Sequence, residues 1–141
     1  MLLARFSQNS VVANLYKMKK FFTCGLFVLL FSLTSFVSVD DVISAIKIGS
    51  ASQLSKYFDN TIAITLPDKT NAYSKSQGEL VLKDFFDNNG VKTFEIVHRG
   101  ENAGAQFIIG TLNTKNGEYR TTIYIRQKGD KQLLQELRFE K

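Results

Sequence analysis

The fold is decided by residues 76–98, SQGELVLKDFFDNNGVKTFEIVH, where the spacing of the apolar residues changes from helical to alternating. In the first half, apolar residues recur three and four positions apart, which predicts a helix with one buried side. Its buried positions are Val81, Leu82, Phe85 and Phe86. Ser76-Gln77-Gly78-Glu79 matches the capping box that begins many helices, and Asn89-Gly90 is a typical helix end.

From Val91 onward, apolar and polar residues alternate, which predicts four strands joined by hairpins. Asn116-Gly117 and Gly129-Asp130 are the turn signals between the later strands. We expect Phe94, Ile96 and His98 to share one strand face. In a later strand the expected apolar face is Tyr119, Thr121, Ile123 and Ile125, and the opposite face is Glu118, Arg120, Thr122, Tyr124 and Arg126.

The residues before Ser76 predict two helices, one strand and a loop. Asp40-Asp41 suits a helix N-terminus, where the helix dipole favours negative charge. Ser52 suits the N-cap of a second helix. The buried side of that second helix is expected to be Leu54, Tyr57 and Phe58. Ile62, Ile64 and Leu66 alternate as a half-buried strand, and Pro67 opens a turn-rich loop.

Helices at the beginning and hairpin strands at the end are typical of the α+β class. We expect a single domain over residues 39–141, in which the N-terminal helices pack on a curved, mostly antiparallel sheet. A long curved sheet wrapped around one amphipathic helix makes a cone with a pocket. The expected architecture is therefore a cone formed by the curved sheet and the helices on one of its faces.

Residues 1–38 predict export. Lys19-Lys20 precede an uncharged run from Phe21 to Val39, which is the layout of a secretory signal peptide. The same run is long enough to span a bilayer, so an uncleaved anchor is the alternative. Both readings send the domain to the periplasm or cell envelope, with membrane contact only through this segment. Because MKKFF opens as signal peptides do, we interpret Met18 as the true start.

The positions of the charged residues and of the single cysteine exclude several kinds of partner and site. The net charge is +5, but Arg5, Lys17 and Lys19-Lys20 precede the apolar run, and the 14 basic and 13 acidic residues from Val39 onward leave only +1. We therefore expect no nucleic-acid partner. The lone cysteine, Cys24, lies early in the apolar run, so no thiol is expected in the domain. With a single histidine and no phosphate-binding motif, we expect no metal and no cofactor.

Several segments together are similar to a known family. They are FDNTIAITLPDKTNAYSKSQGELVLKDFF, FEIVHRG, IIGTL, NGEYRTTIYI and LQELRFEK, spread from about Asp41 to Lys141. This combination resembles the family catalogued as domain of unknown function 4783, exported proteins of Gram-negative bacteria. The resemblance implies a nuclear-transport-factor-2-like (cystatin-like) fold and an exported location. It implies no activity.

Three places are candidates for function. His98 is expected to point at the helix or the pocket, as a general base, as a ligand contact or as a brace of the core. Tyr57 and Tyr73 are candidate ligand contacts of the cone, although Tyr73 also fits as a residue that packs over the core edge. The third candidate is a protein interface, or an ordinary solvated face, formed by Arg120, Tyr124 and Arg126.

These candidates support two functional hypotheses. The favoured one is a noncatalytic exported module that binds a small apolar ligand in the cone or a protein partner, including a second copy, on the sheet face. The alternative is a small enzyme of the isomerase or dehydratase kind that uses His98 with Tyr57 or Tyr73 in an apolar cavity. A filled cone with an apolar outer sheet favours a dimer or a protein partner.

Overall fold

The computed structural model describes residues 38–141. The predictions for the export segment, for Met18 and for Cys24 lie outside these residues. The elements follow in the order α2 (Val39–Lys47), α3 (Ala51–Ser55), β1 (Phe58–Leu66), β2 (Lys69–Ser74), α4 (Lys75–Asn89), β3 (Val91–Asn102), β4 (Ala105–Thr114), β5 (Gly117–Lys128) and β6 (Lys131–Glu140).

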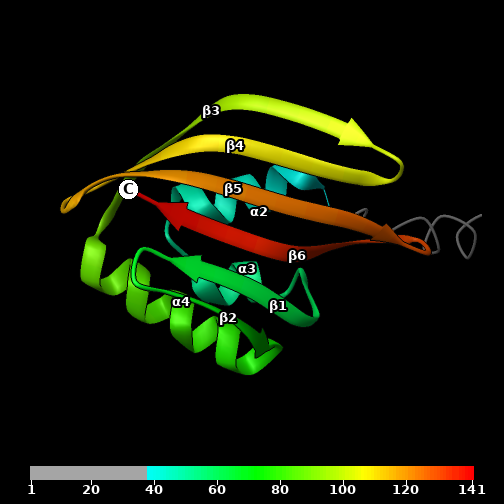
Figure 1. The fold of residues 1–141 in the computed structure, drawn as a ribbon, viewed down its shortest axis with the longest axis horizontal. Helices are drawn as coiled ribbons and strands as arrows, with labels where there is room; N and C mark the ends of the chain where they lie inside the picture. The colour runs from blue at the N-terminus through cyan, green and yellow to red at the C-terminus, as the bar shows by residue number, and fades with distance from the viewer. Residues whose placement is uncertain (1–37) are drawn as a thin grey trace, which may run out of the picture. The chain divides into compact units, whose positions relative to one another are not determined.

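The six strands form one curved sheet in the order β2-β1-β6-β5-β4-β3 (Figure 1). All neighbouring strands are antiparallel except β1 and β6, which run parallel. The buried residues of the three described helices and of the strands form one core cluster, so these helices pack on a single face of the sheet. The predicted α+β class and curved, mostly antiparallel sheet are confirmed.

Serine side chains start each helix. Ser38 begins α2 with a capping box to Asp41, which agrees with the acidic helix start expected there. Ser50, not Ser52 as predicted, caps α3. That helix is only five residues long and ends at Ser55. Phe58, predicted to lie in the helix, is already the first residue of β1.

The start of α4 lies two residues earlier than predicted. Ser74 is the N-cap, and its side chain accepts a hydrogen bond from the Gln77 backbone while the Gln77 side chain accepts one from the Ser74 backbone. The predicted pair of Ser76 and Glu79 does not form the box. Two overlapping S-x-x-[E/Q] patterns occur in this stretch, and the earlier one follows directly on the end of β2.

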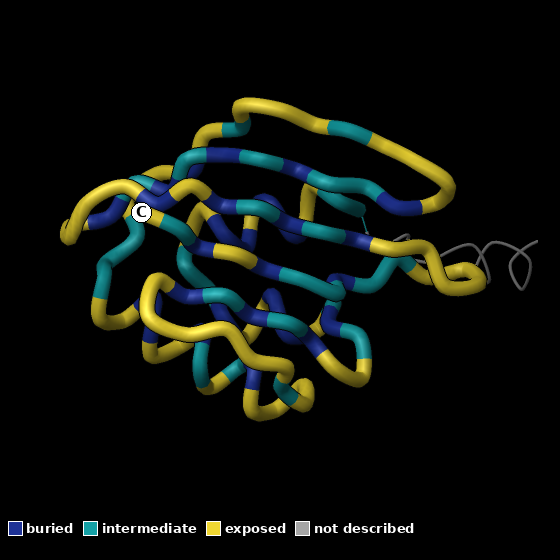
Figure 2. Tube along the Cα trace, viewed as in Figure 1, coloured by how far each residue is buried: buried dark blue, intermediate teal, exposed yellow. Residues whose placement is uncertain are grey.

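The stretch predicted as a loop after Pro67 is a strand. Pro67 and Asp68 make a two-residue turn, and Lys69–Ser74 then pairs with β1 as β2. Its residues are exposed except for Tyr73, so the strand lacks the apolar alternation that identifies half-buried strands. Figure 2 shows this edge of the sheet exposed along its length, whereas the central strands alternate.

The side of the sheet that faces the helices carries the hydrophobic core. Leu82, Phe85 and Phe86 of α4 are buried as predicted, and the Phe85 ring lies 4.7 Å from that of Phe139 and 5.3 Å from that of Tyr119. Each fully buried side chain of this size contributes about 1.5–3 kcal/mol. The close packing of these rings anchors the last strands of the sheet to the helix.

The C-terminus of α4 is tied to the β4–β5 hairpin. The Tyr119 hydroxyl donates to the Asn89 side chain at 2.8 Å, and the Lys115 backbone donates to the carbonyl oxygens of Asn89 and Gly90. Asn116 adds a side-chain hydrogen bond to the Asn88 carbonyl. The predicted turn at Asn116-Gly117 therefore holds the helix end as well as joining two strands.

A charged cluster joins the start of β1 to the far end of the β5–β6 hairpin. Asp59 accepts hydrogen bonds from the side chains of Lys128 and Gln135, and its side chain is only 12% exposed. The hydrogen bonds from Lys128, from the Asn60 backbone and from Gln135 lower the pKa of Asp59 to about 2. The ionised carboxylate is thus the form that the fold stabilises.

We predict that Asp59→Asn lowers the free energy of unfolding by about 1 kcal/mol at neutral pH, because hydrogen bonds to a charged acceptor are lost. The folded pKa of Asp59 is about 2 and the unfolded value is about 3.9. Its contribution is therefore complete above pH ~4 and is lost as the pH falls toward 2. Urea unfolding of both proteins across this range measures the difference.

Asp87→Asn is the matched control. Its partner Lys83 lies one turn away on α4, and both side chains are more than 60% exposed. Exposed pairs of this kind contribute little, so the control is expected to unfold like the original chain. A stability difference between Asp59→Asn and the original chain that stayed constant down to pH 2 would contradict this account of Asp59.

Candidate functional site

The face of the sheet that points away from α2, α3 and α4 is called the outer face. At its centre, cross-strand pairing places Phe107 of β4 opposite Tyr124 of β5, and Ile109 of β4 opposite His98 of β3. We call His98, Phe107, Ile109 and Tyr124 the outer cluster. The last three side chains are half-buried and His98 is exposed. An apolar and aromatic patch therefore lies on a face that none of the described helices covers.

His98 does not share a face with Phe94 and Ile96, so the prediction that it points at the helix or the pocket is wrong. The pairing of β3 with β4 shifts between Ile96 and His98, because Val97 is an additional residue in β3 without a partner of its own. Such a β-bulge reverses which side of the strand the following residues face. His98 consequently lies on the outer face with its ring 5.6 Å from that of Phe107.

Gly100 leaves room for the Phe107 ring on the outer face. Gly100 pairs directly with Phe107, and a Cβ atom at position 100 would lie 2.0 Å from the tip of the Phe107 ring. The ring therefore covers the bare backbone of β3, which is a known way of protecting a glycine in a strand. Because glycine has no side chain, the surface of the outer cluster is flat beside Gly100.

The predicted alignment of Arg120, Tyr124 and Arg126 is confirmed, since alternate residues of β5 point outward and the intervening ones are buried. The Arg126 guanidinium donates to the Tyr124 hydroxyl at 3.4 Å. On the neighbouring strand, Arg138 forms ion pairs with Glu136 at 3.7 Å and Glu140 at 2.9 Å. The rim of the outer cluster thus carries charges of both signs.

Tyr57 and Tyr73 lie apart from His98. Both pack against the core on the helical side, whereas His98 lies on the outer face. Burial and the nearby charge of Asp41 raise the pKa of Tyr57, and its backbone carbonyl accepts a hydrogen bond from Leu134. The arrangement required by the enzyme hypothesis, a histidine and a tyrosine in one apolar cavity, is not formed by these residues.

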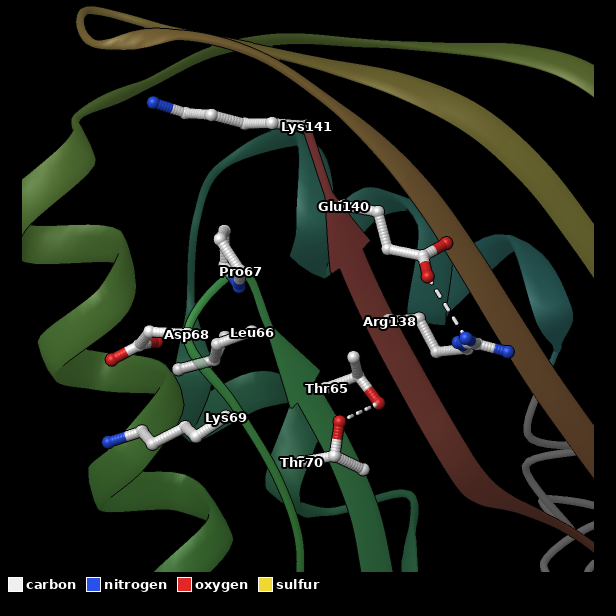
Figure 3. Close-up of a pocket in the computed structure, with 9 residues that line it drawn as sticks. All are labelled: Thr65, Leu66, Pro67, Asp68, Lys69, Thr70, Arg138, Glu140 and Lys141. Carbon is white, nitrogen blue, oxygen red and sulfur yellow. Dashed lines mark hydrogen bonds and ion pairs between the residues drawn. The ribbon is translucent and has the colours of Figure 1, made fainter.

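One hollow of about 590 Å³ lies between the β1–β2 turn and the end of β6 (Figure 3). It is lined by Thr65, Leu66, Pro67, Asp68, Lys69, Thr70, Arg138, Glu140 and Lys141. The hydroxyls of Thr65 and Thr70 lie 3.2 Å apart, and Arg138 is already paired with Glu140. These four polar side chains are therefore already paired within the hollow.

A second hollow of about 470 Å³ lies between β2 and α4. It is lined by Asn71, Ala72, Tyr73, Gln77, Leu80 and Val81. Leu80 is 67% exposed, so it leaves apolar surface beside this hollow. Tyr73, a ligand contact predicted from the sequence, lines this hollow. The hollow itself was not predicted, because β2 was not recognised as a strand.

Neither a metal-binding cluster nor a membrane-spanning helix is present in residues 38–141. No group of three or more histidine, cysteine, aspartate or glutamate side chains in that range is placed to hold a metal ion. None of the helices in the same range has the length and apolar character needed to cross a membrane.

The fold defines a class of protein. The domain is similar to a protein of nuclear-transport-factor-2-like fold from Cytophaga hutchinsonii, with 10% identity, a TM-score of 0.53, and 72% of this chain and 83% of that chain covered. It is also similar to a putative calcium/calmodulin-dependent protein kinase type II association domain from Thiobacillus denitrificans, with 13% identity, a TM-score of 0.58, and 72% and 89% covered. At such identities the likeness shows the fold alone.

Residues 39–140 match the family model described as domain of unknown function (DUF4783), and the chain belongs to this family. A solved relative is a DUF4783 family protein from Bacteroides fragilis, 30% identical, with a TM-score of 0.69 and with 74% of this chain and 98% of that chain covered. No curated protein matches the chain.

The geometry around Phe107 predicts a specific coupling. Gly100→Ala should push the Phe107 ring away, lower the free energy of unfolding by about 1 kcal/mol and shift the NMR signals of the His98 ring. In a Phe107→Ala background, the same Gly100→Ala change should cost little, because the clashing ring is gone. Chemical denaturation of the four proteins gives this double-mutant cycle. Equal costs in both backgrounds would contradict the proposed contact.

Proposed function

We propose that this chain is an exported, noncatalytic association module that forms a homodimer through the outer face of its sheet. The observation that carries the proposal is the outer cluster. Phe107, Ile109 and Tyr124 are apolar or aromatic, lie together on neighbouring strands and are covered by no described helix. Contiguous apolar patches on otherwise polar surfaces commonly mark interaction sites.

The composition of this face suits a protein interface. Tyrosine and arginine are enriched at interface centres, and Tyr124 lies between Arg120 and Arg126 along β5. A two-fold dimer places the same patch on both subunits, so the patch must complement itself. An apolar centre with Arg126 and Glu136 on its rim meets that requirement, because opposite charges can face each other across the axis.

The packing between the helices and the sheet also favours a partner on the outer face. The space between helices and sheet is occupied by core side chains such as Phe85, Phe86 and Phe139, and the two hollows described above lie outside it. This packing favours a partner on the sheet over a small ligand in the cone. The association domain among the structural neighbours carries its assembly role in its name.

The export part of the proposal rests on the sequence. Lys19-Lys20 followed by the uncharged run from Phe21 to Val39 supports a signal peptide or an anchor. Either would deliver the domain to the periplasm or cell envelope, where a domain without cysteines in residues 38–141 needs no control of thiol oxidation.

Sedimentation velocity of residues 38–141 tests the dimer. We expect the domain to dimerise at micromolar concentration, and Tyr124→Lys to weaken dimerisation at least tenfold, about 1.4 kcal/mol, because it places a charge in the apolar centre. Thr65→Lys is the control, since Thr65 is half-buried on the outer face of β1, away from the outer cluster. A monomer at all concentrations, or equal effects of both changes, would overturn the proposal.

A further inference from the structure

We infer that the free edge of β2 is a docking site for an extended segment of another protein, which adds a seventh strand to the sheet. The bound segment would carry an apolar residue at alternate positions and acidic residues at its ends. Three features of the β2–α4 region lead to this inference: the direction of the β2 backbone groups, the hollow beside them and the charges at both ends of the strand.

The backbone groups of β2 that face outward follow from the turn. In a hairpin with a two-residue loop, the flanking residues, here Leu66 and Lys69, exchange both backbone hydrogen bonds, and bonded and non-bonded pairs then alternate. Thr70, Ala72 and Ser74 therefore direct their backbone groups away from β1. The Ser74 backbone N–H agrees with this alternation, because it donates to the side chain of Gln77 in α4 and not to β1.

Thr70 and Ala72 consequently present N–H and C=O groups at the end of the sheet. β2 is the last strand in the order, and both residues are exposed. Such groups are a template for one more strand, and a segment that pairs with them must itself be extended. This constraint selects an extended backbone as the occupant and excludes a helix or a small molecule.

The second hollow lies along this edge. It is lined by the consecutive residues Asn71, Ala72 and Tyr73, whose side chains alternate between the two faces, so a hollow that touches all three lies at the strand edge. On its other side are Leu80 and Val81 of α4. Alternate side chains of an added strand would point toward the Tyr73 and Leu80 side, and an apolar residue there would bury exposed apolar surface.

Charges at the ends of the strand define the occupant further. Lys69 is the first residue of β2 and Lys75 directly follows its last residue. Neither lysine forms an ion pair with any residue in the range 38–141. If two copies paired antiparallel about Ala72, Lys69 of one would lie opposite Lys75 of the other, which is unfavourable. The same lysines attract acidic residues, so the fitting partner is a different segment with acidic ends.

The opposite edge of the sheet, β3, differs in each of these respects. The bulge at Val97 interrupts its pairing, and bulges are a common protection of edge strands. Charged, exposed side chains of both signs occur along it: Lys92, Glu95, Arg99 and Glu101. Only β2 therefore combines a regular free edge with an adjacent apolar hollow among the described strands.

The test is a selection from a display library of random six-residue segments, the length of β2, against residues 38–141. The matched region of the Bacteroides fragilis relative covers 98% of its solved chain, which supports the use of this domain alone. We expect the selected peptides to alternate apolar and polar residues and to carry aspartate or glutamate at their ends. Binding should slow hydrogen exchange at the backbone amides of Thr70 and Ala72.

Ala72→Pro is the decisive variant. Proline removes the one N–H at this position, which points outward, so the β1–β2 pairing and the fold remain while an added strand loses its bond and clashes. We expect affinity for the selected peptides to fall at least tenfold. Ala72→Thr keeps the N–H and serves as the control with unchanged affinity.

Leu80→Lys removes the apolar wall of the hollow without touching the core, because Leu80 is 67% exposed. It should also weaken peptide binding at least tenfold while thermal stability stays the same. Lys69→Glu combined with Lys75→Glu should reverse the selected end charges from acidic to basic. The outer cluster is far from these changes, so Tyr124→Lys should leave peptide affinity unaltered.

Three results would overturn the inference. The first is a library selection that enriches no peptide. The second is full affinity of the enriched peptides for Ala72→Pro, which would show that they do not pair with the β2 edge. The third is loss of peptide binding in Tyr124→Lys, which would place the peptides on the outer face. Homodimerisation is measured separately, so failure of either proposal leaves the other standing.

Discussion

The burial of one side of α4 against a curved sheet is the constraint on which the rest of the structure depends. Phe85 and Phe86 reach Phe139 on β6, and the Asn89 end of the helix is held by Tyr119 on β5. These contacts bring the helix and the last strands together across the domain. Because the helices occupy one face of the sheet, the residues that alternate with the buried ones must point outward.

That one-sided arrangement explains where the candidate surfaces lie. The outer face collects Phe107 and Tyr124 simply because their neighbours Ile108 and Ile123 are buried on the helical side. The β2 edge is open for a different reason, since α4 begins directly after Ser74 and packs beside the strand rather than over its edge. The domain therefore has two separate candidate surfaces, one on a face of the sheet and one at its edge, and each has its own structural cause.

The β-bulge at Val97 changes the side of the sheet on which His98 lies. Because Val97 is an additional residue in β3, the only histidine of the chain lies on the outer face next to Phe107, and not on the helical side as strict alternation would place it. The arrangement that an acid–base mechanism with Tyr57 or Tyr73 would require was therefore not built. A bulge depends on how β3 meets β4 across the hairpin, and alternation along one strand contains no signal for it.

The sequence by itself determined the class, most element positions and the buried side of α4, because apolar spacing reports which residues must leave water. It also aligned Arg120, Tyr124 and Arg126 correctly. Only the tertiary structure decided the strand β2, the Ser74 cap and the side on which His98 lies. The strand β2 and the position of His98 depend on pairing with other strands, and the Ser74 cap depends on a choice between two overlapping capping motifs. The spacing of apolar residues contains no information on either.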